Sequence, residues 1–99
     1  MASGKEYLHY ILDQLSGVEG ITCRAMMGEY ILYCRGKVIG GIYDNRLLLK
    51  PVPAAVELLP GASMERPYDG AKEMLRVDDV DNRELLRSAV ETVYAGVNR

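Results

Sequence analysis

The sequence predicts an α+β fold of two layers, in which an antiparallel β-sheet (a four-stranded meander plus a fifth strand) packs with helices in the order α-β-β-β-β-α-β-α. Two observations predict it. Residues 21–50 contain four short runs rich in β-branched and aromatic side chains, separated by turn signals that contain Gly, Asn or Asp. The segments on either side have apolar residues at helical spacing. The chain of 99 residues is the size of one domain, which we expect to span 1–99.

The connections within the central stretch determine how its strands pair. The four runs are 21–27, 30–34, 38–43 and 47–50. Connections this short force neighbouring strands to be antiparallel. We expect two-residue turns at 28–29 and 36–37. For the third connection, 44–46, we expect a three-residue loop with a bulge, because this keeps Leu47 and Leu49 on the uncharged face of the sheet.

Side-chain alternation then divides the sheet into two faces. The uncharged face, which we expect to be the core, contains Ile21, Cys23, Ala25, Met27, Tyr30, Leu32, Cys34, Ile39, Gly41, Tyr43, Leu47 and Leu49. The opposite face, called the second face below, mixes basic groups with six sizeable apolar side chains. That is too much apolar surface for a face that meets only water. Either a helix of the same chain covers part of it, or a partner does.

Part of the second face is our candidate protein-binding surface. It combines apolar area with Arg and Tyr, which are enriched at binding hot spots. Its residues are Arg24, Ile31, Tyr33, Arg35 and Val38. We expect it to be a homodimer seam or the site of another protein. If a helix covers it instead, Arg24 pairs with a carboxylate such as Glu29 or one from a helix.

Capping signals mark the first and last helices. Ser3 and Glu6 have the spacing of a capping box, in which each side chain satisfies a free amide at the helix start. Asp81 and Glu84 repeat this spacing before the last apolar stripe, and Gly96 marks its expected end. Both helices should pack on the core face.

Between the meander and the last helix the signals are weaker. Residues 54–59, bounded by prolines, favour a short helix, and residues 62–70 are expected to form a loop. Residues 71–77 favour helix individually, but only seven positions are available and their pattern can alternate. We interpret them as the fifth strand.

The two cysteines are expected to be buried thiols. In the register above, Cys23 and Cys34 are cross-strand neighbours at a hydrogen-bonded pair, whose geometry suits a disulfide poorly. In a reducing compartment they are better interpreted as two small buried apolar groups.

No motif indicates catalysis, and we expect no enzyme activity, no cofactor and no metal. Two cysteines and one histidine are too few for a zinc site. Asp78, Asp79 and Asp81 lack the ligand spacing of a calcium loop. Gly40-Gly41 lies inside a strand pattern, where paired glycines indicate a bulge or a close backbone approach and not a phosphate loop.

Charge bears on the class of partner. The chain carries a net charge of −2, but residues 21–50 contain five basic and two acidic groups, a balance of +3, which leaves −5 for the remainder. With a pI near 5.3, we expect no direct binding to duplex DNA. No apolar run has the length of a membrane span and the first residues do not form a signal peptide, so we expect a cytoplasmic protein that does not bind membranes.

Two strings of residues in the central stretch carry a family resemblance: Arg24-x-Met26-Met27-Gly28-Glu29-Tyr30-x-x-Tyr33-x-x-Gly36-Lys37-Val38 and Asp44-Asn45-Arg46-Leu47-x-Leu49-Lys50. They resemble the TfoX/Sxy amino-terminal domain family, and the resemblance covers nearly the whole chain. It implies a two-layered fold similar to secretion-chaperone folds, which supports a strand at 71–77. Met27 stands where the family usually has Phe, and Ile31 where it usually has Gly.

The resemblance also implies a function. Full-length bacterial competence regulators of this family add a carboxy-terminal helical domain, and we expect this chain to stand alone without it. The implied function is a non-enzymatic regulatory or protein-binding module, related to transcriptional control of competence. The alternative hypothesis is a small acidic chaperone-like homodimeric protein that shields a segment of a partner.

Overall fold

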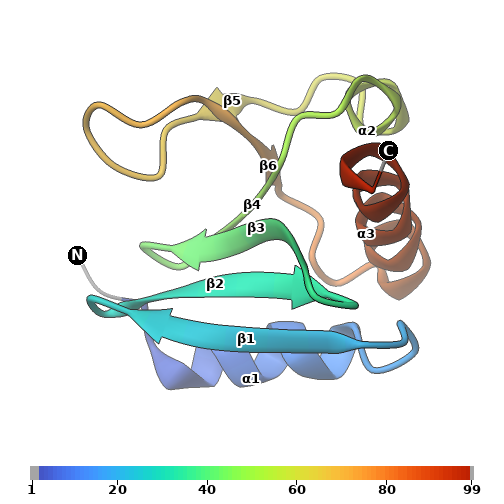
Figure 1. Ribbon diagram of the computed structural model, residues 1–99. Helices are drawn as coiled ribbons and strands as arrows, with labels where there is room; N and C mark the ends of the chain where they lie inside the picture. Colours follow the sequence, from blue (N-terminus) through green and yellow to red (C-terminus); the bar gives the residue numbers. More distant parts are fainter. Residues whose placement is uncertain (1–2, 99) are drawn as a thin grey trace.

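The computed structural model describes residues 3–98, which form three helices and one antiparallel six-stranded sheet (Figure 1). The elements are α1 (Lys5–Gln14), β1 (Ile21–Met26), β2 (Glu29–Cys34), β3 (Lys37–Tyr43), β4 (Arg46–Leu49), α2 (Pro53–Leu58), β5 (Met64–Glu65), β6 (Met74–Val77) and α3 (Arg83–Val97). The strand order in the sheet is β1-β2-β3-β4-β6-β5. The predicted α+β class and order of elements are confirmed, with one additional two-residue strand, β5, in the stretch predicted to be a loop.

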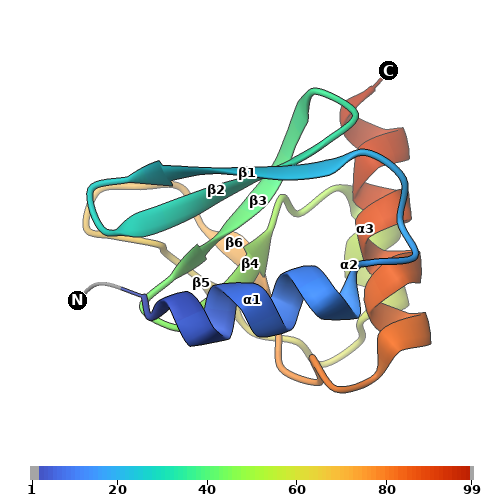
Figure 2. The same ribbon diagram turned by 90° about the horizontal axis from the view of Figure 1, so that it is seen from below.

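The core lies between one face of the sheet and the helices. In the view of Figure 2, α1 crosses in front of the strands, and α3 runs along one side of the molecule beside α2. Both long helices bury the apolar stripe that the sequence predicts. The core residues include Leu8 and Ile11 from α1 and Leu15 at its C-cap, Leu86, Val90 and Val93 from α3, and Leu32, Ile39, Ile42, Leu47 and Leu49 from the sheet. Complete burial of one such side chain contributes about 1.5–3 kcal/mol, so this cluster is the main source of stability.

All three hairpin turns of the meander contain two residues with positive φ. These pairs are Met27-Gly28 (φ 51° and 85°), Arg35-Gly36 (48° and 84°) and Asp44-Asn45 (52° and 55°). The first two turns therefore begin one residue earlier than predicted, and the third has two residues and not three. The physical reason is that turns of this type match the twist of the strands only when both central residues have positive φ. Gly takes the second of these positions, whereas our register placed it first.

The corrected first turn moves the pairing of β1 and β2 by two residues. Cys23 pairs with Leu32, and Cys34 pairs with Ile21, so the cysteines are not cross-strand neighbours. A shift of two leaves every side chain on its predicted face. The expected division of β2 into two faces therefore survives the error in register.

A bulge in β3 changes which side chains enter the core. Ile39 is an extra residue, because its two neighbours pair with successive residues of β2. Alternation reverses at this point, so Ile39 and Ile42 are both fully buried in the core. Gly41 and Tyr43, predicted for the core face, lie on the second face instead. The bulge that we expected in the third turn lies instead in β3, next to Gly40-Gly41.

The paired glycines of β3 occur where the backbones approach closely, as predicted. A Cβ atom on Gly40 would lie 2.1 Å from the carbonyl oxygen of Leu48 in β4. On Gly41 a Cβ atom would lie 2.6 Å from the ring of Tyr43. Glycine at position 41 thus leaves room for the Tyr43 ring to pack against the backbone there.

Strand β1 is an edge of the sheet, and none of its residues is buried. Cys23 and Ala25, predicted for the core, are exposed, and Met27 in the following turn is 97% exposed. The side chains of Cys23 and Ala25 point to the core side of the sheet, but an edge strand has a neighbour on one side only. The prediction of a buried thiol is therefore wrong for Cys23. It is confirmed for Cys34, where burial raises the pKa of the thiol.

The first helix does not begin with the predicted capping box. Gly4 occupies the N-cap position and makes no side-chain cap. Ser3 instead donates from its backbone nitrogen (2.9 Å) and its Oγ (2.7 Å) to Oε1 of Glu29. The carboxylate of Glu29 offers Ser3 a charge-assisted bond, which is stronger than a neutral cap. The start of α1 is thereby tied to the first hairpin.

The last helix begins one residue later than a capping box at Asp81 and Glu84 would require. Asn82 is the N-cap residue, and its Oδ1 accepts a hydrogen bond from the backbone nitrogen of Leu85 (3.1 Å). Gly96, the expected end, lies inside α3. A Cβ atom there would come within 2.8 Å of the Val52 side chain, so this glycine permits close packing and does not end the helix.

Candidate binding surface

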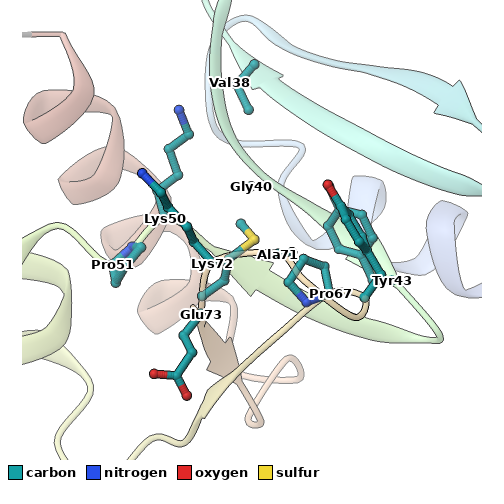
Figure 3. A pocket seen from close by; sticks show the side chains of 11 residues that line it. Val38, Gly40, Tyr43, Lys50, Pro51, Pro67, Ala71, Lys72 and Glu73 are labelled. Atoms are coloured by element: carbon teal, nitrogen blue, oxygen red, sulfur yellow. The ribbon is translucent and has the colours of Figure 1, made fainter.

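The second face is covered in part by a loop and not by the long helices. The buried side chains of α1 and α3 are directed to the core on the other face. The β5–β6 loop, residues 66–73, lies over β3 and β4 (Figure 3). Leu48, which points to the second face, is fully buried outside the core cluster. The two alternatives left open by the sequence were a helix or a partner, and this loop is a third kind of cover.

A cluster of charges holds the start of this loop. Oε1 of Glu65 accepts a hydrogen bond from Nη1 of Arg46 (2.7 Å). Oε2 accepts bonds from Oγ of Ser63 (2.8 Å) and Nη1 of Arg76 (3.1 Å). These bonds, that of Arg46 first, lower the pKa of Glu65 to about 2. We call Arg46, Glu65 and Arg76 the arginine clamp, because they tie β4 and β6 to the residue before the loop.

One hollow opens at the end of the second face beside the first hairpin. It has a volume of about 510 Å³ and is called the methionine hollow. Its lining is formed by Met26, Met27, Glu29, Tyr43, Pro67 and Tyr68. Both methionines are exposed, and Met27 adopts a positive φ that is unfavourable for a residue with a side chain. Methionine side chains adapt their shape to a partner and are common at binding surfaces.

A second hollow, of about 390 Å³, lies over β3 and is called the lysine hollow (Figure 3). It is lined by Val38, Gly40, Tyr43, Lys50, Pro51, Pro67, Tyr68, Ala71, Lys72, Glu73 and Met74. In Figure 3 the side chains of Lys50 and Lys72 extend in the same direction, and the carboxylate of Glu73 points the opposite way. Within residues 3–98, neither lysine forms an ion pair.

Two tyrosines join the hollows into one groove. Tyr43 from β3 and Tyr68 from the loop line both hollows, and their ring centroids are 6.5 Å apart at an interplanar angle of 58°. Such tilted pairs are mutually attractive. Burial raises the pKa of the Tyr43 hydroxyl above its ordinary value, at which the group is already a hydrogen-bond donor at neutral pH. We call the two hollows and this pair the tyrosine groove.

Four of the five predicted site residues lie on the second face. Arg24 is exposed on β1, and Ile31 and Tyr33 are half-buried on β2. Val38 is half-buried and lines the lysine hollow. Arg24 does not pair with Glu29, whose carboxylate is bonded to Ser3 and to the backbone nitrogen of Asp44.

Arg35, the fifth predicted residue, is held on the helical side and does not belong to this surface. Its guanidinium lies 4.1 Å from the centroid of the Tyr94 ring, forms an ion pair with Glu91, and donates to the carbonyl oxygen of Glu19 (2.7 Å). Strand alternation predicts the face on which a side chain lies only where the backbone is extended. Arg35 has a φ of 48°, which redirects its side chain toward α3.

Sequence reasoning missed most of the groove. Tyr43 was placed on the core face because the predicted register contains no bulge in β3, although Gly40-Gly41 indicates a bulge or a close backbone approach there. Tyr68 and Lys72 lie in a loop without periodicity, which carries no signal of orientation. The departure from the family pattern at Met27 was noticed, but that residue was assigned to the core.

Residues 3–98 offer neither a metal cluster nor a membrane span. No group of three or more His, Cys, Asp or Glu side chains in this part of the chain could hold a metal ion. None of its helices has the length and apolar character needed to cross a membrane.

Comparisons with known proteins identify the family. The family profile described as the TfoX N-terminal domain matches residues 13–95, a range that includes the whole sheet and the tyrosine groove. An uncharacterized 12.7 kDa protein in the trpE 5′ region of Spirochaeta aurantia is 39% identical over 80 residues, which are 81% of this chain and 70% of that relative. No solved structure matches the chain significantly. The chain therefore belongs to the TfoX N-terminal domain family.

Proposed function

We propose that this protein is a non-enzymatic protein-binding module that holds a segment of a partner in the tyrosine groove. The observation that carries the proposal is a groove with exposed Met27 and Tyr68 on the face of the sheet that the long helices leave free. Exposed apolar area of this kind, lined by aromatic and methionine side chains, is typical of protein interaction sites.

The conformation of Met27 supports this function. A residue with a side chain loses about 1 kcal/mol or more in the left-handed region, and Met27 recovers nothing through packing because it is 97% exposed. A residue that lowers the stability of the free protein and makes no packing contact within it suits a role in binding a partner. Its burial by a partner would contribute about 1.5–3 kcal/mol.

The size of the exposed surface fits a modest affinity. Met26, Met27 and Tyr68 together offer three apolar side chains, and burying what remains exposed contributes on the order of 1.5–3 kcal/mol for Met27 and less for the other two, which are already partly buried. Association costs at least about 4 kcal/mol in lost freedom of motion. We therefore propose reversible binding, which suits a regulatory module.

A role in the transcriptional control of competence is the form of regulation that the family name suggests, and we propose that the protein exerts it in the cytoplasm through protein contacts.

Affinity capture with matched variants tests this function. The purified chain, Tyr68→Ser, Met27→Asn and the control Val56→Ser are used as baits in lysate of the source cells, and captured proteins are quantified by mass spectrometry. Val56 is 42% exposed on α2, away from the groove. A true partner is retained by the unmodified chain and the control but lost with both groove variants. Equal capture by all four baits contradicts the proposal, provided that circular dichroism shows each to be folded.

A second candidate function, the chaperone-like homodimer, is favoured by the free edge of β1. Five of its six residues are exposed, and it contains a single charge, Arg24, and no proline or bulge. Charged side chains, prolines and bulges usually protect an edge strand from pairing with another chain, and β1 has only the one charge. Antiparallel pairing of two β1 strands would join two sheets. Sedimentation velocity over a range of concentrations, with bis-maleimide cross-linking through Cys23, tests this, and a monomer throughout removes the candidate.

A further inference from the structure

The charges around the lysine hollow are unbalanced. Arg46 and Arg76 line the neighbouring part of the second face, but both are paired: Arg46 with Glu65, and Arg76 with Glu65 and Asp78. Lys50 and Lys72 form no ion pair within the described part of the chain. One end of the tyrosine groove therefore presents two cations without a counter-charge.

The acidic side chains that line the groove do not balance these cations. Glu29, at the other end, accepts hydrogen bonds from Ser3 and from the backbone nitrogen of Asp44 (3.0 Å). Glu73 lines the lysine hollow, but its carboxylate is directed away from the two lysines (Figure 3). A ligand in the lysine hollow would thus meet positive charge at the mouth.

The walls of the same hollow are mainly apolar. Val38, Pro51, Ala71 and Met74 contribute carbon atoms to it. Its volume of about 390 Å³ lies within the range of about 300–1,000 Å³ that is typical of ligand pockets. The hollow therefore suits an apolar side chain, with an anionic group beside it.

We infer that the tyrosine groove selects partner segments in which an apolar side chain, seated in the lysine hollow, is adjacent to a carboxylate that contacts Lys50 and Lys72. This inference rests on the proposed function and adds the chemical class of the partner to it. Lys-carboxylate pairs at an exposed rim are individually weak, so we expect them to change affinity by about three- to tenfold in total and to be sensitive to salt.

An acidic peptide fits the surface better than a nucleic acid does. The chain has a net charge of −2, so a polyanion is repelled by the molecule as a whole, whereas one or two carboxylates respond to the local cations. A phosphate backbone also has no apolar group for the hollow. Lysine suits this task because its flexible stem can follow a carboxylate without a fixed geometry.

Selection from a random peptide library tests the inference. The full chain is immobilised, enriched peptides are sequenced, and the best is synthesised with a fluorophore for anisotropy titrations at low and high salt. The test variant combines Lys50→Gln with Lys72→Gln, and the control combines Lys5→Gln with Lys37→Gln, two exposed lysines that do not line the hollow. We expect Asp or Glu next to apolar residues in the enriched peptides. The test variant should bind about three- to tenfold more weakly and lose the salt dependence, while the control should not change.

The outcomes separate the inference from the proposed function. Enriched peptides without acidic residues, whose binding is abolished by Tyr68→Ser but not by the lysine variant, would overturn the inference and leave the proposed function standing. If no peptide is enriched, or binding is indifferent to Tyr68→Ser, both fail. A short duplex DNA that binds with the same dependence on Lys50 and Lys72 would overturn the assignment to an acidic peptide.

Discussion

Replacing Glu65 by Gln measures what the arginine clamp contributes to stability. Gln keeps the shape of the side chain but removes the charge that holds Arg46 and Arg76. Lowering the pKa of Glu65 from 4.5 to about 2 corresponds to about 3 kcal/mol without screening, at 1.36 kcal/mol per pKa unit. The side chains of Glu65 and Arg76 are 25% and 38% exposed, and solvent screening reduces this value. We expect Glu65→Gln to lower the free energy of unfolding by about 1 kcal/mol at neutral pH.

The pH dependence of this loss follows from the direction of the pKa shift. Because the folded-state pKa of Glu65 is lowered, the unfolded chain binds the proton more readily, and the stabilisation is fully present only above the unfolded value near 4.5. It is lost as the pH falls through the folded-state pKa of about 2. The difference in unfolding free energy between wild type and Glu65→Gln should stay constant from about pH 7 to about pH 5.5. It should decrease steadily below that.

Urea unfolding followed by circular dichroism, at several pH values between about 7 and 3, is the assay. The control is Glu73→Gln, which removes an exposed carboxylate from the loop that follows Glu65 and should change stability by less than about 0.5 kcal/mol. A difference for Glu65→Gln that is as large at about pH 3 as at about pH 7 would refute the reasoning, because a loss of packing, and not of charge, would then be its cause.

Two further predictions concern the first hairpin and the thiols. Met27→Asn should raise the free energy of unfolding by about 0.5–1 kcal/mol in urea denaturation, because Asn followed by Gly28 is the preferred pair for a turn with two positive φ values. A loss of stability would show that Met27 has a structural role in the free protein. Cys23 should react with a thiol reagent at once in native buffer, while Cys34 reacts only after denaturant is added, because one is exposed and the other buried. Mass spectrometry of the labelled peptides distinguishes them, and equal rates would contradict the fold at β1.

The features that could be predicted from the sequence depend on neighbouring residues. Turn residues and apolar periodicity are local signals, and they were sufficient for the order of the elements and for the burial of Leu47 and Leu49. The face of each residue in β2 was also correct, since a register error of two residues preserves alternation. Ile31 and Tyr33 were therefore placed on the second face correctly, but of the five predicted site residues only Val38 lines the tyrosine groove.

The missing features depend on contacts between distant parts of the chain. The bulge at Ile39 transfers Tyr43 to the second face, and Gly40-Gly41 indicates an irregularity near it but not which residue is left unpaired. The position of the Arg35 side chain is set by its contacts with α3, which is more than 50 residues away in the sequence. The loop over the second face is held by Glu65, whose partners come from two other strands. Pattern reasoning within single elements has no access to such contacts.

One wall of the tyrosine groove is a loop, residues 66–73, and the opposite wall is the sheet itself. Doubling the length of a loop costs only about 0.6 kcal/mol in closure entropy, whereas a change in the sheet disturbs the core beneath it. Insertions and substitutions between β5 and β6 can thus accumulate during evolution while the rest of the domain is retained. Members of the family could diverge in what they recognise through this segment alone, with the sheet and the arginine clamp as the constant frame.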